Sequence, residues 1–355
     1  MDNLKRLDYV DIAKGLGMLM VIWGHINSGS TFVLVYSFHM PLFFFLSGIV
    51  FNSNRYQSFK AFFIRKVKTL VIPYLIFSFL TWLVWVVYTI VFHSAVDSYF
   101  MPLLQTFIAQ GSGGYLVHNV PLWFVSCLLL IEFLYYFISK IKNDFLIVLI
   151  CVIFAIASYV MELCLPIFDF TLLPWSIGVA FAAIIFYAAG NLLMKHNFFS
   201  RVKEFCNNKI VISWVILIFM TAALYYLALL NGHITMGHEQ YNNRLLFYLN
   251  GFWGSLCVLI FAFLTEKLFS IKAFSFIKWI GLNSLYFMFI ENPVKGFVVS
   301  IIGRIIKISE TVISSSFVWS ILAFVISTTI TVIVVKIILV IRRFFRKIGG
   351  SQNVD

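Results

Sequence analysis

The chain consists largely of apolar runs of about 20 residues, and this feature limits its possible folds more than any other. In lipid, each spanning segment must satisfy its own backbone hydrogen bonds, so an apolar run of that length is expected to be a helix. Of the 355 residues, 62% are hydrophobic and only 11% are charged. Such a composition excludes a soluble globular domain and predicts an all-α, polytopic membrane protein.

The apolar runs predict about ten transmembrane helices. They lie at residues 8–27, 34–51, 69–92, 120–138, 145–164, 172–193, 209–230, 246–264, 279–301 and 314–341. No polar segment between them is long enough for a separate soluble domain. We therefore expect residues 1–348 to form a single transmembrane domain, followed by a short cytoplasmic tail at 349–355.

The basic residues are distributed very unevenly between the two ends of these predicted helices. Twenty of the 26 Lys and Arg residues lie at the N-terminus, in the even-numbered connections or in the C-terminal tail. Because such an excess marks the cytoplasmic side, both termini are expected to be cytoplasmic. Basic loops beside anionic membrane lipid also account for the net charge of +12, so this charge does not indicate nucleic acid as a partner.

Lys14 and His25 are the most informative pair, because ionisable residues inside a membrane helix are costly and usually functional. They lie eleven positions apart, or about three helical turns, so both side chains leave the same face of the first predicted helix. Along its axis they are about 16 Å apart, roughly half the thickness of the hydrocarbon core. Alone, each would suit a snorkelling lysine or an interfacial histidine, but the pair on one face favours a function.

A second histidine, His39, would lie at the same outer end as His25 if the first two helices form a hairpin. The two imidazoles would then act as base and orienter, or His39 would simply be an interfacial residue. Glu132 in the fourth predicted helix and Glu291 in the ninth are also candidates to tune His25. Isolated carboxylates are expensive in lipid, so both are expected to face a polar cavity.

Two further polar residues within predicted helices are Trp123 and Asn292, which together with Glu291 are candidates to contact a substrate. Pro293 follows Asn292 directly. Because proline removes a backbone hydrogen bond, it predicts an interruption of the ninth helix, either to line a cavity or simply to kink the helix.

A basic cluster formed by Arg65, Lys66 and Lys68 precedes the third predicted helix on its cytoplasmic side. The simpler interpretation is a positive-inside anchor. The functional interpretation is a cradle for a polyanionic donor such as coenzyme A, whose phosphates suit guanidinium and ammonium groups. Lys14 would contribute to the same cradle.

The seventh connection, residues 231–245, is polar and contains His233. Polar outer loops with aromatic neighbours suit a carbohydrate, which needs hydrogen-bonding groups and flat apolar surfaces, although they also suit solvation alone. The five cysteines have no metal-binding or redox spacing and are expected to be small core residues. We therefore expect no metal site.

Taken in order, several motifs resemble the acyltransferase-3 family of integral membrane acyltransferases, most closely its fucose 4-O-acetylase-like branch. They are Arg6-Leu7-Asp8 with Asp11–Gly15, the pair Lys14 and His25 as an Arg/Lys-x10-His motif, Phe38–Gly48, Arg65–Tyr74, Pro121–Glu132, residues 231–233 and Gly281–Tyr286.

The resemblance implies about ten membrane helices and transfer of an acyl group, usually acetyl, to a hydroxyl of a cell-surface glycan or a lipid-linked oligosaccharide. Acetyl-CoA would be the donor on the cytoplasmic side of a bacterial inner membrane, with the acceptor at the outer face. His25 matches the histidine thought to be essential, and Lys14 its basic partner. Arg65 and Lys68 match a pair of arginines, with lysine in place of the second.

One departure concerns the ninth predicted helix, where many relatives carry a histidine and this chain has Glu291 and Asn292. The rival hypothesis is a transporter or flippase of an acyl or glycan substrate, because buried charges and a broken helix are also transporter features. Against this rival, the sequence has no internal repeat. The sequence leaves open direct transfer or an acyl-enzyme, the identity of the glycan, and the oligomeric state.

Overall fold

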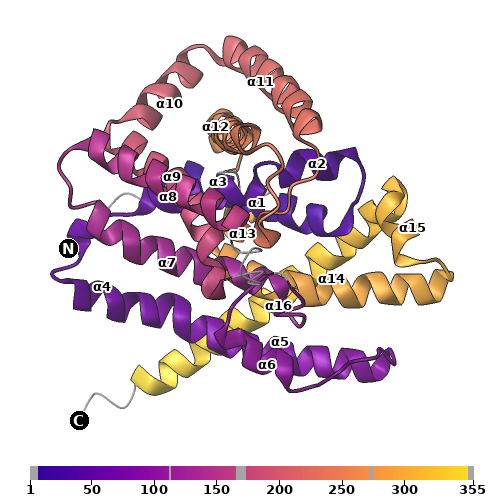
Figure 1. Cartoon of the computed structure of the whole chain (residues 1–355). Helices are drawn as coiled ribbons and strands as arrows, with labels where there is room; N and C mark the ends of the chain where they lie inside the picture. The colour runs from indigo at the N-terminus through magenta and orange to yellow at the C-terminus, as the bar shows by residue number, and fades with distance from the viewer. Residues whose placement is uncertain (1–6, 112, 165–172, 270, 272–274, 351–355) are drawn as a thin grey trace.

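The computed structural model describes residues 7–111, 113–164, 173–269, 271 and 275–350, and the regular structure of this part of the chain is helical, mostly α with short 3-10 segments and one π segment, apart from one isolated β-bridge. The helices form one bundle (Figure 1). The longer ones are α1 (Asp8–Ile26), α3 (His39–Val50), α4 (Phe59–Lys66), α5 (Ile72–Val91), α7 (Trp123–Ile138), α8 (Asp144–Cys164), α9 (Ile177–Lys195), α10 (Phe198–Asn208), α11 (Ile210–Asn231), α12 (Arg244–Phe269), α14 (Ser284–Ile306) and α16 (Phe317–Gly350). The shorter ones are α2 (Ser30–Tyr36), α6 (Met101–Leu104), α13 (Phe276–Leu282) and α15 (Glu310–Ser315).

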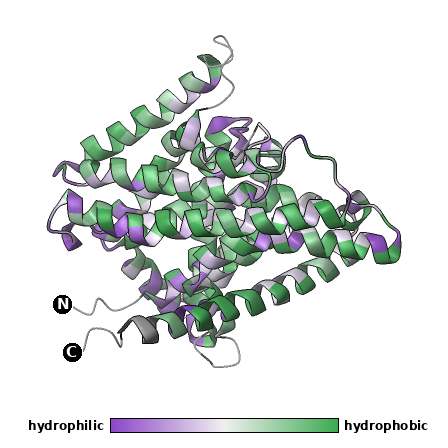
Figure 2. Cartoon of the chain, turned by 90° about the horizontal axis from the view of Figure 1, so that it is seen from below, coloured by the Kyte–Doolittle hydropathy of each residue, from purple (hydrophilic) through white to green (hydrophobic). Residues whose placement is uncertain are grey.

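Within the described residues, nine helical stretches are long and apolar enough to cross a membrane. They are Thr31–Val50, Phe59–Val91, Val120–Ile138, Asp144–Cys164, Pro174–Lys195, Ile210–Asn231, Arg244–Phe269, Ser284–Ile306 and Phe317–Phe345. Figure 2 shows hydrophobic residues along most of their length. This confirms a polytopic membrane protein. The remaining predicted span is α1, which is less apolar because it carries Asp8, Asp11, Lys14 and His25.

Helix α1 packs inside the bundle, against α2, α3, α12, α13, α14 and α16. Small residues allow other helices of the bundle, such as α3 and α9, to approach each other closely. A Cβ at Gly48 of α3 would overlap the backbone carbonyl of Tyr187 in α9, and one at Gly190 of α9 would overlap that of Phe45 in α3. Such contacts replace the hydrophobic effect as the basis of helix association in lipid.

The second predicted helix, 34–51, is divided in the structure into α2 and α3 by a break at Ser37 and Phe38. The Ser37 hydroxyl donates to the carbonyl of Leu34 at 2.7 Å, and Phe38 has a non-helical backbone. Pro41 lies in the first turn of α3, where its missing N–H costs nothing. The break turns the chain just before His39.

The basic cluster lies inside a helix instead of in a connection, because the helical run extends from Phe59 to Val91. Its middle is a π-helical segment, Val67–Val71, in which the N–H of Ile72 bonds to the carbonyl of Val67. Pro73 cannot donate a hydrogen bond and its ring would clash with the preceding turn, so the wider π-turn accommodates it.

The interruption predicted at Pro293 is wrong, because α14 continues through it from Ser284 to Ile306. Proline at 293 leaves the carbonyl of Phe289 without its usual helical donor. The side-chain amide of Asn119 supplies one instead, donating to the Phe289 carbonyl at 2.8 Å. The helix therefore continues because its lost backbone bond is replaced, and a feature that favoured the transporter hypothesis is removed.

Replacing Asn119 with alanine is expected to destabilise the protein, because it leaves the buried carbonyl of Phe289 unpaired. The cost is about 1–3 kcal/mol. The loss should be smaller in a Pro293→Ala background, where residue 293 regains an N–H for the same carbonyl. Melting temperatures in detergent of wild type, the two single variants and the double variant would measure the effect. Equal losses in both backgrounds would contradict the account.

Candidate active site

Two cavities lie toward opposite ends of α1, and α1 and α3 reach both of them. The basic cavity has a volume of about 1540 Å³ and is lined by Lys14 from α1, the end of α3 and Ser139 after α7. The histidine cavity has a volume of about 300 Å³ and is lined by His25 from α1, the start of α3 and Trp123 at the start of α7. Lys14 and His25 thus face two different cavities.

The histidine cavity combines residues from five parts of the chain that are far apart in sequence. Its lining is Val21, His25, Tyr36, His39, Met40, Val120, Pro121, Trp123, Phe124, Thr235, Met236, Gly237, His238, Met288, Asn292 and Lys295. The structure therefore brings together the sequence-predicted residues His25, His39, Trp123 and Asn292. Tyr36, His238 and Lys295 were not among the predicted site residues.

His25 lies against a buried carboxylate, that of Glu291. Its Nδ1 is 2.9 Å from Oε1 of Glu291, and the Glu291 side chain is completely buried. The two atoms are close enough for an ion pair, although the ring N–H is not aligned as in a regular hydrogen bond. The contact places Glu291 behind His25, outside the residues that line the cavity, where it can hold the ring and stabilise its charged form.

His39 enters the same cavity from α3 and is oriented by its own chain. Its Nδ1 donates to the carbonyl of Val35 at 2.8 Å. In the neutral ring, Nε2 is then the nitrogen that can accept a hydrogen bond. The ring of Tyr36 lies between the two histidines, 4.8 Å from His39 and 6.5 Å from His25 by ring centroids. Within the described residues, Glu291 and not His39 is the group in polar contact with His25.

The loop that follows α11 forms one rim of the histidine cavity. Asn242 holds it by donating to the carbonyls of Asn231 and His233, at 2.7 and 2.8 Å. His233 is not part of the cavity lining but stacks on Phe32, with ring centroids 4.7 Å apart. Its partial burial, and then the nearby His238, lower the pKa of His233 and favour the neutral ring.

Trp123 is held firmly in the wall of this cavity. A Cβ at Gly111 or at Gly237 would collide with its indole ring, so both glycines are needed to make room for it. Trp123 is buried, yet it lines the cavity beside Asn292. The sequence named Trp123 and Asn292 as candidates to contact a substrate, and both line this cavity.

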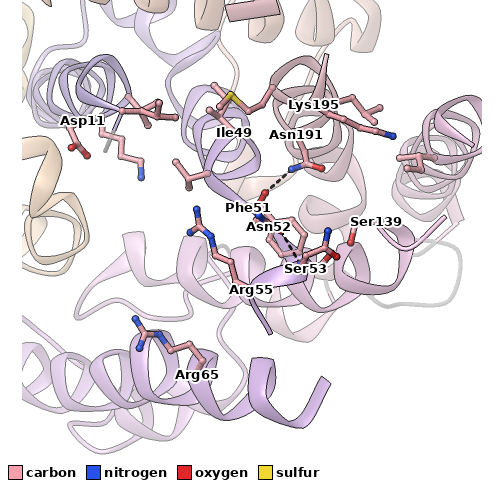
Figure 3. A pocket seen from close by; sticks show the side chains of 18 residues that line it. Asp11, Ile49, Phe51, Asn52, Ser53, Arg55, Arg65, Ser139, Asn191 and Lys195 are labelled. Atoms are coloured by element: carbon pink, nitrogen blue, oxygen red, sulfur yellow. Dashed lines mark hydrogen bonds between the residues drawn. The ribbon is translucent and has the colours of Figure 1, made fainter. Parts of the chain in front are cut away.

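The basic cavity collects four cationic side chains, from Lys14, Arg55, Arg65 and Lys195. Figure 3 shows Arg55 and Arg65 extending into the space beneath Ile49 and Asn191. Asn191 caps the end of α3, since its amide donates to the carbonyls of Gly48 and Phe51 at 3.1 and 2.9 Å. Arg55, which was not among the site residues predicted from the sequence, lies in the connection between the second and third predicted helices.

The structure separates the remaining members of the predicted basic cluster from this cavity. Lys66 donates to Oε1 of the buried Glu132 at 2.6 Å, so these two residues neutralise each other. Lys68 is exposed and is not part of the cavity lining. The expectation that Glu132 tunes His25 is therefore replaced by the contact with Glu291, and of the cluster only Arg65 lines the cavity. Helical geometry explains the separation of Arg65 from Lys66, because neighbouring residues leave a helix about 100° apart.

Signals for the missed residues were present in the sequence. Lys295 lies four residues after Glu291 and thus on the same face of α14. Tyr36 lies three residues before His39.

Within the part of the chain that the structure describes, no group of His, Cys, Asp or Glu side chains is arranged to hold a metal ion.

The chain matches a known protein family over a range that includes both cavities. The family model of an acyltransferase domain, that of the acyltransferase-3 family, matches residues 7–336. No curated protein and no solved structure matches the chain. All residues that line the basic and histidine cavities fall within the matched range.

Proposed function

The chain is a membrane-bound acyltransferase of the acyltransferase-3 family, and we propose that it transfers an acetyl group from acetyl-CoA to a hydroxyl of a cell-surface or exported glycan. The acceptor is a surface glycan or a lipid-linked oligosaccharide. The observation that carries the proposal is His25 backed by the buried Glu291, in a cavity at the opposite end of α1 from a cluster of cations. The motifs quoted above favour the fucose 4-O-acetylase-like branch.

In this proposal His25 is the general base. With Nδ1 directed to Glu291, Nε2 is the basic nitrogen, and it takes the proton from the sugar hydroxyl. The sugar oxygen bonds to the thioester carbonyl carbon, the carbon–sulfur bond breaks, and the departing thiolate receives the proton from His25. Glu291 keeps the ring oriented and stabilises the imidazolium that forms in between. An acyl group carried transiently on His25 is the alternative route, which a trapped acetyl-protein that disappears on adding acceptor would support.

The basic cavity is the proposed site for the nucleotide end of acetyl-CoA. Its four cations suit phosphates, and arginine can bind a phosphate through two parallel hydrogen bonds. Arg55 and Arg65 form neither ion pairs nor side-chain hydrogen bonds with other described residues, so they remain available to a ligand. The axial distance from Lys14 to His25, about 16 Å, is comparable to the length of the pantetheine arm.

We place the basic cavity on the cytoplasmic side of the bacterial inner membrane, where acetyl-CoA is available. The basic connections support this orientation through the positive-inside bias, and they also favour contact with anionic membrane lipid. The histidine cavity then lies near the outer face, with the acceptor.

The test of the proposed function compares the surface glycan of cells with and without this protein. Wild-type cells should carry a base-labile acetyl group, visible in the intact mass and as acetate released by alkali, that cells without the protein lack. Membranes containing the protein should also transfer label from acetyl-CoA to the glycan of deficient cells. Movement of glycan across proteoliposomes in the absence of acetyl-CoA would instead favour a transporter.

Replacing Glu291 with glutamine should lower kcat by about a hundredfold, the low end of what a positioned base contributes, and should change the KM of the acceptor little. Glutamine keeps the size of the side chain but loses the charge that stabilises the imidazolium. Steady-state kinetics in nanodiscs would measure both constants. Glu204→Gln, an exposed glutamate on α10, is the control and should behave as wild type. Unchanged kcat in Glu291→Gln would show that this contact has no catalytic role.

A further inference from the structure

Lys295 is a cation in the wall of the histidine cavity that no other described residue compensates. It lies on α14, four residues after Glu291, and lines the cavity together with His25 and Asn292. The side chain is half-buried. Among the residues that the structure describes, it forms neither an ion pair, nor a hydrogen bond, nor a cation–π contact with another residue.

Several other cations of this bundle have partners. Lys66 pairs with Glu132, Lys278 with Asp8, and Arg244 with Glu162. Lys336 lies over the ring of Trp279, 5.8 Å from its centroid. A lysine in a spanning helix without such compensation is costly, and residues of this kind usually mark a binding site.

The histidine cavity itself offers Lys295 no counter-charge. Its sixteen lining residues include three histidines and no carboxylate. Glu291 is buried against His25, and Glu239 beside the rim packs on Gly178, where an added Cβ would overlap its carboxylate. The missing negative charge is therefore expected on the molecule that occupies the cavity.

We propose that Lys295 binds an anionic group of the acceptor, so that the enzyme acetylates an acidic saccharide. The group is a sugar carboxylate or a phosphate near the hydroxyl that His25 deprotonates. Trp123 provides a flat surface for the sugar ring, and Asn292 can hydrogen-bond to a neighbouring hydroxyl. This inference rests on the proposed function, because it takes the histidine cavity to be the acceptor site.

The experiment measures binding to the full-length protein in nanodiscs and does not need turnover. The probes are methyl β-D-glucopyranoside, methyl β-D-glucuronide and methyl β-D-glucopyranoside 6-phosphate, which share one ring and differ in charge. Wild type should bind at least one anionic probe about tenfold or more tightly than the neutral one, as expected for a hydrogen bond to a charged group. The stronger of the two anionic probes distinguishes carboxylate from phosphate.

Lys295→Met should lose this preference, and Lys295→Arg should keep it. The matched control is Lys307→Met, an exposed lysine at the end of the same helix, which should retain the wild-type preference. Melting temperatures verify that each variant is folded. Equal binding of all probes by wild type, or an undiminished preference in Lys295→Met, would overturn the proposal.

A separate measurement of transfer from acetyl-CoA to the same probes distinguishes the failure of this inference from failure of the proposed function. If wild type transfers acetyl groups but binds the charged and neutral probes equally, only the acidic acceptor is rejected. If wild type binds the anionic probes selectively but transfers no acetyl group, the anion site at Lys295 is supported and the proposed acetyltransferase function is rejected. If Lys295→Met lowers kcat equally for neutral and anionic probes, Lys295 stabilises the reacting oxygen, and the proposal is overturned.

Discussion

His25→Gln is expected to lower the rate of acetyl transfer by about a hundredfold to ten-thousandfold, the range that a positioned general base contributes. Glutamine fills a similar volume but cannot accept and release a proton near neutral pH. Binding of acetyl-CoA should be preserved, because the basic cavity lies toward the other end of α1. Transfer of labelled acetyl groups in membranes, together with equilibrium binding of the donor, measures the two effects separately.

The control for His25→Gln is His93→Asn, which alters an exposed histidine with left-handed backbone that asparagine also tolerates. It should retain full activity. A His25→Gln protein that is expressed, folded and fully active would refute the assignment of the base. Complete loss of donor binding in His25→Gln would contradict the separation of the two cavities.

Arg65→Gln and Arg55→Gln should each raise the KM for acetyl-CoA about tenfold, and the double variant about a hundredfold, because each guanidinium contributes a charge-assisted hydrogen bond to a phosphate. The kcat at saturating donor should change little, since neither residue lines the histidine cavity. Donor-saturation curves on purified protein measure both constants.

Lys68→Gln is the matched control for these substitutions, because it removes a neighbouring positive charge that does not line the basic cavity. Its KM for acetyl-CoA should stay within about twofold of wild type, as an exposed charge contributes little. If Lys68→Gln matched the effect of Arg65→Gln, the donor would contact the whole cluster and the geometry of the basic cavity would be wrong.

The first helix illustrates what could be predicted from the sequence. Lys14 and His25 were recognised because ionisable groups are rare in apolar runs, and their spacing of eleven residues follows from helical geometry. The membrane-spanning segments were equally accessible, since each depends only on local length and composition. The assignment failed at Pro293, where the helix continues because Asn119, far away in the sequence, replaces the missing donor.

The partners of the ionisable residues show what local sequence cannot supply. Glu132 and Glu291 were equal candidates to tune His25, because both are carboxylates within apolar helices. The structure places Glu132 against Lys66 and Glu291 against His25. Arg55 and Lys295 also gained significance only from the cavities that they line. Each of these contacts depends on how one helix is rotated against another.

The sequence by itself therefore determined that this is an all-α membrane protein, which helix carries the histidine proposed as the base, and which family it resembles. These properties follow from hydropathy, spacing and short motifs, all of which are local. Only the tertiary structure decided that Lys14 and His25 line two different cavities, that Glu291 backs His25, and that Lys295 has no counter-charge among the described residues. The physical reason is that ion pairing and cavity shape arise between helices distant in the chain, where side-chain packing and backbone approach at glycine set the register.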